Sequence, residues 1–188
     1  MRIIVGITGA SGAVYGRELL RRLRGQGHET HVIVSPYGWK VLEHECDTGR
    51  KDILALADHL HDHDDLAALP ASGSFRADAM AVVPCSMRTL AAIACGLADN
   101  LLCRAADVML KERKNLVLAV RETPLNAIHL ENMLKLARLG VGIVPVCPGF
   151  YHRPSTIDDL VTMMVGRIMD SLGLDTSGFP RWQGLPDA

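Results

Sequence analysis

Short and almost continuous apolar runs recur along the chain, and amphipathic stretches separate them. Apolar runs of this length are typical of strands buried on both faces, as in a parallel sheet. We expect strands at residues 3–7, 30–34, 79–83, 116–120 and 141–146. We expect helices at residues 15–23, 39–45, 87–94, 101–111, 124–139 and 157–172. Because strands and helices alternate, the sequence predicts a three-layer α/β sandwich whose parallel sheet carries helices on both faces.

The length of 188 residues fits one domain, and neither an internal repeat nor a linker interrupts the pattern. We therefore expect a single domain over residues 1–188. Residues 51–69 are polar and rich in histidine and aspartate, and their structure is the hardest to predict. The tail after Gly173 is too apolar for a plain disordered end, so we expect it to pack on the domain.

Composition narrows the classes of function. A net charge of -1 and a pI near 6.7 give no reason to expect nucleic acid or an anionic membrane as a partner. Five cysteines without a C-x-x-C pair argue against a disulfide framework and against a zinc ribbon, and favour a reducing compartment. The sequence shows neither a signal peptide nor an apolar stretch of membrane-spanning length. We expect a cytoplasmic protein.

Two adjacent charged residues, Arg121 and Glu122, end the apolar run 116–120. In open α/β sheets the carboxyl ends of the strands form the ligand crevice. Arg104 and Lys111 are seven positions apart on a predicted helix, so they share a face. Buried cations are costly unless an anion satisfies them. The pattern therefore predicts that three cations and one carboxylate meet at one part of the fold around an anion such as a phosphate.

Three glycines have the spacing G-x-x-G-x-x-G: Gly6 near the end of the first predicted strand, and Gly9 and Gly12 between it and the first predicted helix. Such a turn either lets backbone N–H groups approach a phosphate or is a purely structural tight turn. A dehydrogenase is disfavoured because the chain lacks a Tyr-x-x-x-Lys pair. Moreover, Ser35 stands where a dinucleotide site has an acidic residue for the ribose. A flavin mononucleotide has no such ribose, so Ser35 is compatible with FMN.

A series of motifs covers nearly the whole chain, at residues 6–12, 71–74, 84–86, 100–101, 104–108, 110–113, 121–122, 124–125, 128–133, 148–152 and 180–182. With them the chain resembles the UbiX/Pad family of flavin prenyltransferases. The resemblance implies a Rossmann/flavodoxin-like fold and transfer of a dimethylallyl group from dimethylallyl monophosphate to reduced FMN. It further implies that the prenylated FMN passes to a UbiD-type decarboxylase, and that the protein is a homo-oligomer, commonly a dodecamer.

The resemblance also implies roles for individual residues. FMN would contact Gly9, Ala10, Ser11, Ser35, Ser86, Met87, Arg88, Thr89 and Arg121. The prenyl phosphate would contact Arg104, Lys111, Glu122, Tyr151 and Arg167. The catalytic residues would be Ser11, Glu45, Lys111, Glu122 and Trp182. The chain has no D-D-x-x-D motif for magnesium, so cations and a tyrosine would stabilise the leaving phosphate, and we expect no metal.

Each of these residues also has a simpler interpretation. Lys111 could form an i,i+4 pair with Asp107, worth about 0.3–0.5 kcal/mol, and Glu122 could pair with the arginine before it. Ser11 could cap the following helix, and Arg167 could be solvated. Trp182 could serve tail packing instead of facing an allylic cation.

Two further alternatives concern the polar segment and the activity. Residues 58–65 look superficially like a metal tract, but a solvated variable loop is the interpretation we adopt. The rivals in function are a non-catalytic FMN-binding subunit of an aromatic acid decarboxylase and a flavin-dependent Cys-peptide decarboxylase. The second rival is disfavoured because residues 84–87 lack the Met-Asn pair of those enzymes.

Overall fold

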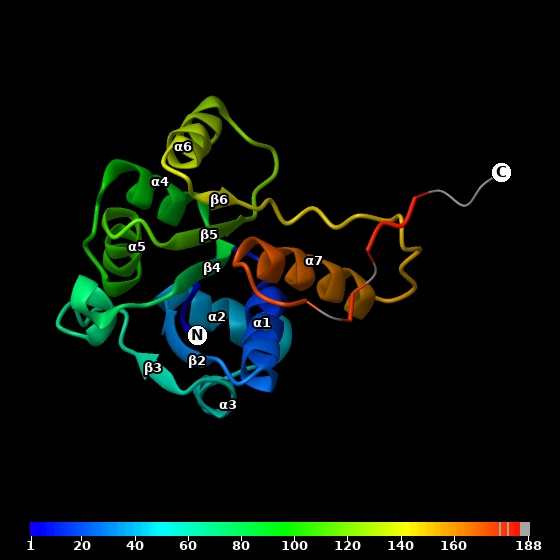
Figure 1. The fold of residues 1–188 in the computed structure, drawn as a ribbon, viewed down its shortest axis with the longest axis horizontal. Helices are drawn as coiled ribbons and strands as arrows, with labels where there is room; N and C mark the ends of the chain where they lie inside the picture. The colour runs from blue at the N-terminus through cyan, green and yellow to red at the C-terminus, as the bar shows by residue number, and fades with distance from the viewer. Residues whose placement is uncertain (177, 180, 185–188) are drawn as a thin grey trace.

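The computed structural model describes residues 1–176, 178–179 and 181–184, and Figure 1 shows a sheet between helices. The strands are β1 (Arg2–Ile7), β2 (Glu29–Val34), β3 (His59–His61), β4 (Ala79–Cys85), β5 (Asn115–Val120) and β6 (Gly142–Ile143). The helices are α1 (Ala13–Gly25), α2 (Pro36–Cys46), α3 (Arg50–Leu56), α4 (Met87–Cys95), α5 (Leu101–Lys111), α6 (Ala127–Arg138) and α7 (Ile157–Ser171). Two 3-10 turns are η1 (Leu69–Ala71) and η2 (Gly73–Phe75).

The strands pair in the order β3-β2-β1-β4-β5-β6, and every pair is parallel. This confirms the predicted three-layer Rossmann/flavodoxin-like sheet, with the strand order of the Rossmann type. The chain moves outward from β1 through β2 to β3, then returns to place β4 on the other side of β1. The reversal opens a crevice above the carboxyl ends of β1 and β4, where ligands of such sheets bind.

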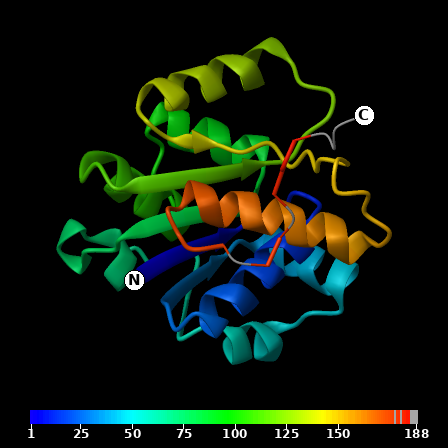
Figure 2. The ribbon, with the colours of Figure 1, turned by 45° about the vertical axis from the view of Figure 1, so that its right-hand side comes forward.

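Alternating strand residues build two cores, one on each face of the sheet. Ile3, Val5 and Ile7 pack with α1, α2, α3 and α7, whereas Ile4 packs with α4, α5 and α6. Figure 2 shows these two helical layers on opposite sides of the strands. Gly6 faces the second layer, where a Cβ would lie 3.0 Å from Leu102 of α5. In the part of the chain that the structure describes, no helix is long and apolar enough to cross a membrane.

The elements differ from the prediction in four places. Helix α6 begins at Ala127 instead of residue 124, because Asn126 caps it by accepting the N–H of His129 at 2.9 Å. Strand β6 keeps only two of six expected residues. Strand β4 continues through Pro84 to Cys85, with a register shift against β5. The polar segment 51–69, whose structure was hardest to predict, begins within helix α3, and β3 occupies residues 59–61 of the expected solvated loop 58–65.

The tail after Gly173 packs against α7, as predicted. Phe179 is 8% exposed, and its ring lies where a Cβ on Gly166 would stand, 2.3 Å from the ring carbon Cδ1. Asp170 of α7 accepts hydrogen bonds from Arg181 at 2.9 and 3.1 Å. The tail motif therefore has a fixed place on the domain, although Pro180 of that motif lies outside the described residues.

Candidate active site

A cavity of about 710 Å³ opens at the carboxyl ends of β1, β2 and β4. Its walls contain five of the nine residues expected to bind FMN, namely Gly9, Ser35, Ser86, Arg88 and Thr89. Ala10 and Met87 do not line the cavity and are buried, with exposed fractions of 6% and 9%. The cavity thus occupies the crevice that the strand order creates, and it is large enough for a cofactor-sized ligand.

Two helices point their amino ends at this cavity. Ser35 caps α2 by accepting the N–H of Gly38 at 3.0 Å, and Ser86 caps α4 by accepting the N–H of Thr89 at 3.3 Å. Both serines and Thr89 also line the cavity. Helix amino ends carry partial positive charge and spare N–H groups, so this wall suits an anionic group such as a phosphate.

The floor of the cavity is held by Thr8, which is 1% exposed. Its hydroxyl donates to the carbonyl of Pro84 at 2.7 Å and accepts the N–H of Ser86 at 2.9 Å, which fixes the end of β4 against the end of β1. Next to it, Gly9 leaves no room for a side chain, because a Cβ there would lie 2.5 Å from Cβ of Tyr37. This glycine keeps the backbone accessible from the cavity.

Three predicted residues, Ser11, Glu45 and Arg121, meet beside the glycine turn. The Glu45 carboxylate accepts the N–H groups of Gly12 at 2.8 Å and Ala13 at 3.0 Å, at the start of α1. Arg121 donates to the carbonyl of Ser11 at 3.2 Å. Burial alone would raise the pKa of Glu45, but hydrogen bonds from Ser11 and the two N–H groups, together with Arg121, lower it. Glu45 caps α1, so the alternative that Ser11 does so is wrong.

Arg104 and Lys111 project from α5. Arg104 donates to the carbonyl of Ala71 at 3.1 Å and forms an ion pair with Asp107 at 2.6 Å. Lys111 pairs with its neighbour Glu112. The simple alternative for Lys111, a pair with Asp107, is therefore wrong, since Arg104 occupies that carboxylate. Both cations border the 71–74 motif and remain accessible to a ligand.

Lys111 and Glu122 lie at opposite ends of β5. The Lys111 ammonium lies next to Gly73, where a Cβ would stand 2.8 Å from it. Glu122 follows the other end of the strand and accepts the N–H of Thr123 at 3.0 Å. The six residues of β5 span about 20 Å. The expectation that three cations and a carboxylate meet within one chain is therefore wrong, because only Arg121 and Glu122 lie at the cavity end of β5.

The remaining predicted residues lie on the 147–156 loop, on α7 and on the tail. The rings of Tyr151 and Trp182 meet edge to face, with centroids 5.7 Å apart. Arg167 forms an ion pair with Asp170 at 3.3 Å and is 55% exposed, which agrees with a solvated helix residue. The tail thus brings Trp182 to Tyr151 and fixes one aromatic pair of the predicted substrate site.

Sequence reasoning missed several cavity residues, among them Thr8, Tyr37, His63, Asp64 and Asn100. Asn100 had a detectable signal, because an asparagine before a helical stretch is a typical N-cap, and it accepts the N–H of Cys103 at 3.0 Å. His63 comes from the segment without a recognised pattern. Its Nδ1 atom is buried without a hydrogen-bond partner in the described part of the chain. An unsatisfied buried polar atom in a cavity wall fits a polar ligand such as FMN.

Comparison with known proteins agrees with this geometry. The profile of the flavoprotein family matches residues 1–169. A probable UbiX-like flavin prenyltransferase of Escherichia coli is 51% identical, over 100% of this chain and 96% of its own. A solved structure of AnUbiX (PadA1), in complex with FMN and dimethylallyl pyrophosphate, covers 98% of both chains at 50% identity with a TM-score of 0.96. The dodecameric FMN-dependent UbiX-like decarboxylase of Escherichia coli O157:H7 is 51% identical, covers 98% of this chain and 100% of its own, and has a TM-score of 0.96.

Proposed function

This chain belongs to the flavoprotein family, among the UbiX-like flavin prenyltransferases, and we propose that it transfers a dimethylallyl group from dimethylallyl monophosphate to reduced FMN. The observation that carries the proposal is the cavity at the carboxyl ends of β1, β2 and β4, lined by the residues expected to hold FMN. The solved relative that holds FMN with dimethylallyl pyrophosphate supports FMN and a dimethylallyl phosphate ester as the ligands here.

The cavity residues divide the work of binding FMN. Ser35, Ser86, Arg88 and Thr89 offer hydroxyls, helix N–H groups and a guanidinium to the phosphate. The turn that carries Gly9 would receive the remainder of the flavin, together with Ala10, Ser11, Met87 and Arg121. When bound and reduced, FMN supplies the nucleophilic ring atoms that accept the dimethylallyl group.

Glu45 and Ser11 position the reacting side of the site. Glu45 stays ionised at neutral pH, because hydrogen bonds from Ser11, Gly12 and Ala13 lower its pKa against the effect of burial. An ionised carboxylate accepts hydrogen bonds only, so it orients the Ser11 hydroxyl as a donor toward itself and leaves its lone pairs for the flavin. In this proposal Ser11 relays a proton at the ring and Glu45 holds it in place.

The prenyl phosphate would be held by Arg104, Lys111, Glu122, Tyr151 and Arg167. Because Lys111 and Glu122 lie at opposite ends of β5, we propose that neighbouring copies complete each other's sites in a homo-oligomer. Helix α6 supports assembly, since Ile128, Leu130 and Leu134 expose 65%, 53% and 51% of their surfaces. The dodecameric relative suggests twelve copies. Trp182 would face the allylic cation with its ring.

We further propose that the departing phosphate needs no metal, that the product serves a UbiD-type decarboxylase, and that the protein works in the reducing cytoplasm. All five cysteines are free, which suits that compartment. Cys85 is fully buried, and burial raises the pKa of its thiol, so it packs in the core instead of acting as a nucleophile.

The test is anaerobic incubation of the protein with reduced FMN and dimethylallyl monophosphate, followed by mass analysis of the flavin. We expect one added C5H8 unit per flavin, with the same yield after treatment with EDTA. A flavin that binds but is never prenylated would favour the non-catalytic subunit. Release of CO2 from a cysteine-terminated peptide would favour the decarboxylase. Loss of transfer on EDTA treatment, restored by magnesium, would contradict the metal-free reaction.

A further inference from the structure

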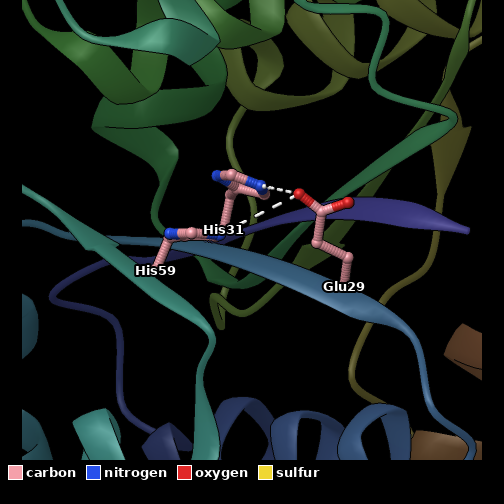
Figure 3. A group of neighbouring side chains, drawn as sticks. All are labelled: Glu29, His31 and His59. Carbon is pink, nitrogen blue, oxygen red and sulfur yellow. Dashed lines mark hydrogen bonds and ion pairs between the residues drawn. The ribbon is translucent and has the colours of Figure 1, made fainter.

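A cluster of metal-ligating side chains lies outside this site, where β3 joins β2 at the edge of the sheet. His31 and His59 are partners in the parallel register of the two strands, so their side chains leave the same face. Glu29 precedes His31 by two positions and shares that face. Figure 3 shows the three side chains turned toward one another. We propose that Glu29, His31 and His59 bind a divalent transition metal, with Zn²⁺ the best match for one carboxylate and two imidazoles.

The distances suit a shared ion. Glu29 Oε1 lies 2.9 Å from His31 Nε2 and 3.9 Å from His59 Nε2, and the three ligand atoms lie within 4.8 Å of one another. Ligand atoms around a tetrahedral zinc lie about 3.3 Å apart. The two imidazoles are stacked, with centroids 4.4 Å apart and planes inclined by 20°, so one ring must turn before both nitrogens face the ion. His59, with 51% of its side chain exposed, is free to turn, whereas His31 is buried.

His61 prepares His31 for this role. The Glu29 oxygen that faces His31 also accepts from Nε of Arg2 at 3.1 Å, and a carboxylate beside a guanidinium acts as an acceptor. His31 Nε2 therefore donates to Glu29, and its Nδ1 accepts from His61 Nε2 at 2.9 Å. With a metal on Nε2, the proton of His31 moves to Nδ1 and His61 becomes the acceptor. A ligating histidine is commonly oriented by such a partner on its other nitrogen.

Arg2 opposes the ion and offers a way to test it. Its Nε lies 3.1 Å from the same Glu29 oxygen, and its guanidinium lies over the ring of Phe75, 4.7 Å from the centroid. A cation at this distance repels a metal, so removing its charge should tighten metal binding. If the cluster were only a network of hydrogen bonds and ion pairs, the same change would remove a contact to Glu29 and would not raise the affinity for a metal.

The site also connects to the cavity through the chain. Strand β3 has three residues and ends two positions before His63, which lines the cavity with Asp64. An ion that joins β2 to β3 would hold this short strand in place and steady that part of the wall. Its role is structural, so it is compatible with a prenyl transfer that needs no metal.

The experiment uses the full-length, FMN-loaded protein after dialysis against EDTA. Calorimetry with Zn²⁺ measures affinity, and absorption with Co²⁺ reports the ligands. We expect one ion per chain and, at an excess of about a hundred times Kd, a melting temperature raised by roughly 5–10 °C. His59→Gln should lower the affinity at least about tenfold. The matched control His44→Gln, an exposed histidine on α2, should leave it unchanged. Arg2→Gln should raise it.

Three results would overturn the proposal. The first is an absence of saturable binding of either ion. The second is binding that His59→Gln leaves intact, because the ion would then sit elsewhere, for example on the exposed Cys95 or Cys147. The third is an affinity that Arg2→Gln fails to raise. None of these readouts involves prenyl transfer, so they stand apart from the proposed activity.

Discussion

At the scale of single residues, Glu45 links two elements that border the glycine turn. It lies near the end of α2, and its carboxylate caps α1 through Gly12 and Ala13. The amino end of α1 is therefore capped by a side chain from another helix, and not by one of its own neighbours in the sequence. A change at Glu45 should move the glycine turn, and with it Ser11.

The first prediction follows from this cap. Glu45→Gln keeps the shape but removes the charge, so the free energy of unfolding at pH 7 should fall by about 1 kcal/mol. The lowered pKa means that the stabilisation by Glu45 exists above the unfolded value of 4.5 and is lost as pH falls through the folded pKa. The difference between wild type and variant should therefore shrink below that pH. Urea unfolding at several pH values measures it.

The control is Glu43→Gln, an exposed carboxylate on the same helix that makes no contact with the glycine turn in the contacts described. An equal loss in both variants would show that the general charge of α2, and not the cap, is responsible. A difference between wild type and Glu45→Gln that does not change with pH would also contradict the cap.

The second prediction separates phosphate from flavin. Lys111 should stabilise the leaving phosphate by a charge-assisted bond of roughly 1.5–3 kcal/mol. Lys111→Ala should lower prenyl transfer about ten- to a hundredfold while FMN binds as before. Flavin titration and single-turnover absorbance with dimethylallyl monophosphate measure the two effects. Lys51→Ala, an exposed lysine on α3, is the control. If Lys111→Ala kept near wild-type transfer, this lysine would have no part in the reaction and would serve only in its ion pair with Glu112.

Local chemistry explains which site residues could be predicted from the sequence. Ser35 and Ser86 each precede a helix and accept the N–H of the residue three positions further on. Such local N-caps can be predicted from the sequence. The contact of Glu45 with the start of α1 spans 33 positions, and no local pattern indicates it. The distance between Lys111 and Glu122 was also missed. The two residues are only eleven positions apart, but β5 lies between them and places them at its opposite ends.

At the scale of elements, apolar periodicity predicted most helices and strands because their cores are built from their own repeats. Helix α5 has the predicted bounds, since Asn100 caps it and its buried face is continuous. Strand β3 was missed because it is an edge strand of three residues, His59–His61, with no apolar run. Strand β6 is shorter than its apolar run, because the regular ladder with β5 ends at Ile143. Beyond it, the N–H groups of Val144 and Val146 still donate to carbonyls of β5 at 2.9 Å.

The third prediction concerns the contact between α7 and the tail. Gly166→Ala puts a methyl group onto the ring of Phe179, so the tail should leave α7 at a cost of about 1–3 kcal/mol. Trp182 should then lose its place beside Tyr151, and trypsin should cut faster at Arg181. FMN binding should stay unchanged while prenyl transfer falls.

Gly25→Ala is the matched control for this change, because a Cβ at that glycine meets open space at the end of α1. It should leave both the tryptic cleavage rate and transfer at the wild-type level. If trypsin cuts Gly166→Ala no faster than wild type, the packing of Phe179 on Gly166 does not hold the tail on α7. If the tail is released but transfer persists, Trp182 has no role in the reaction.

At the scale of the whole molecule, the residues proposed for one site lie in two places of the chain. Ser11 contacts Arg121 beside the glycine turn, whereas Lys111 lies at the far end of α5. The fourth prediction is that two variants with impaired transfer restore each other when co-expressed. If each site combines Ser11 of one copy with Lys111 of another, about a quarter of the sites in random mixed oligomers of Ser11→Ala and Lys111→Ala should be intact.

The readout is prenyl transfer per flavin in the purified mixed oligomer, with light scattering to establish its size. Mixing the two separately purified oligomers without exchange of subunits is the control and should restore nothing. If co-expression gives no recovery, both residues act within the same chain. A monomer with full activity would contradict the shared site altogether.

The sheet has one further property that bears on such an assembly. Its two outer strands are β3 with three residues and β6 with two. An outer strand with unpaired backbone groups can pair with strands of other chains and so lead to aggregation. Short outer strands expose few such groups. A protein packed at high copy number within a closed particle needs contacts that stop at a defined size. Because the outer strands are short, pairing between strands of different copies does not compete with such contacts. Helices and loops therefore determine the size of the assembly.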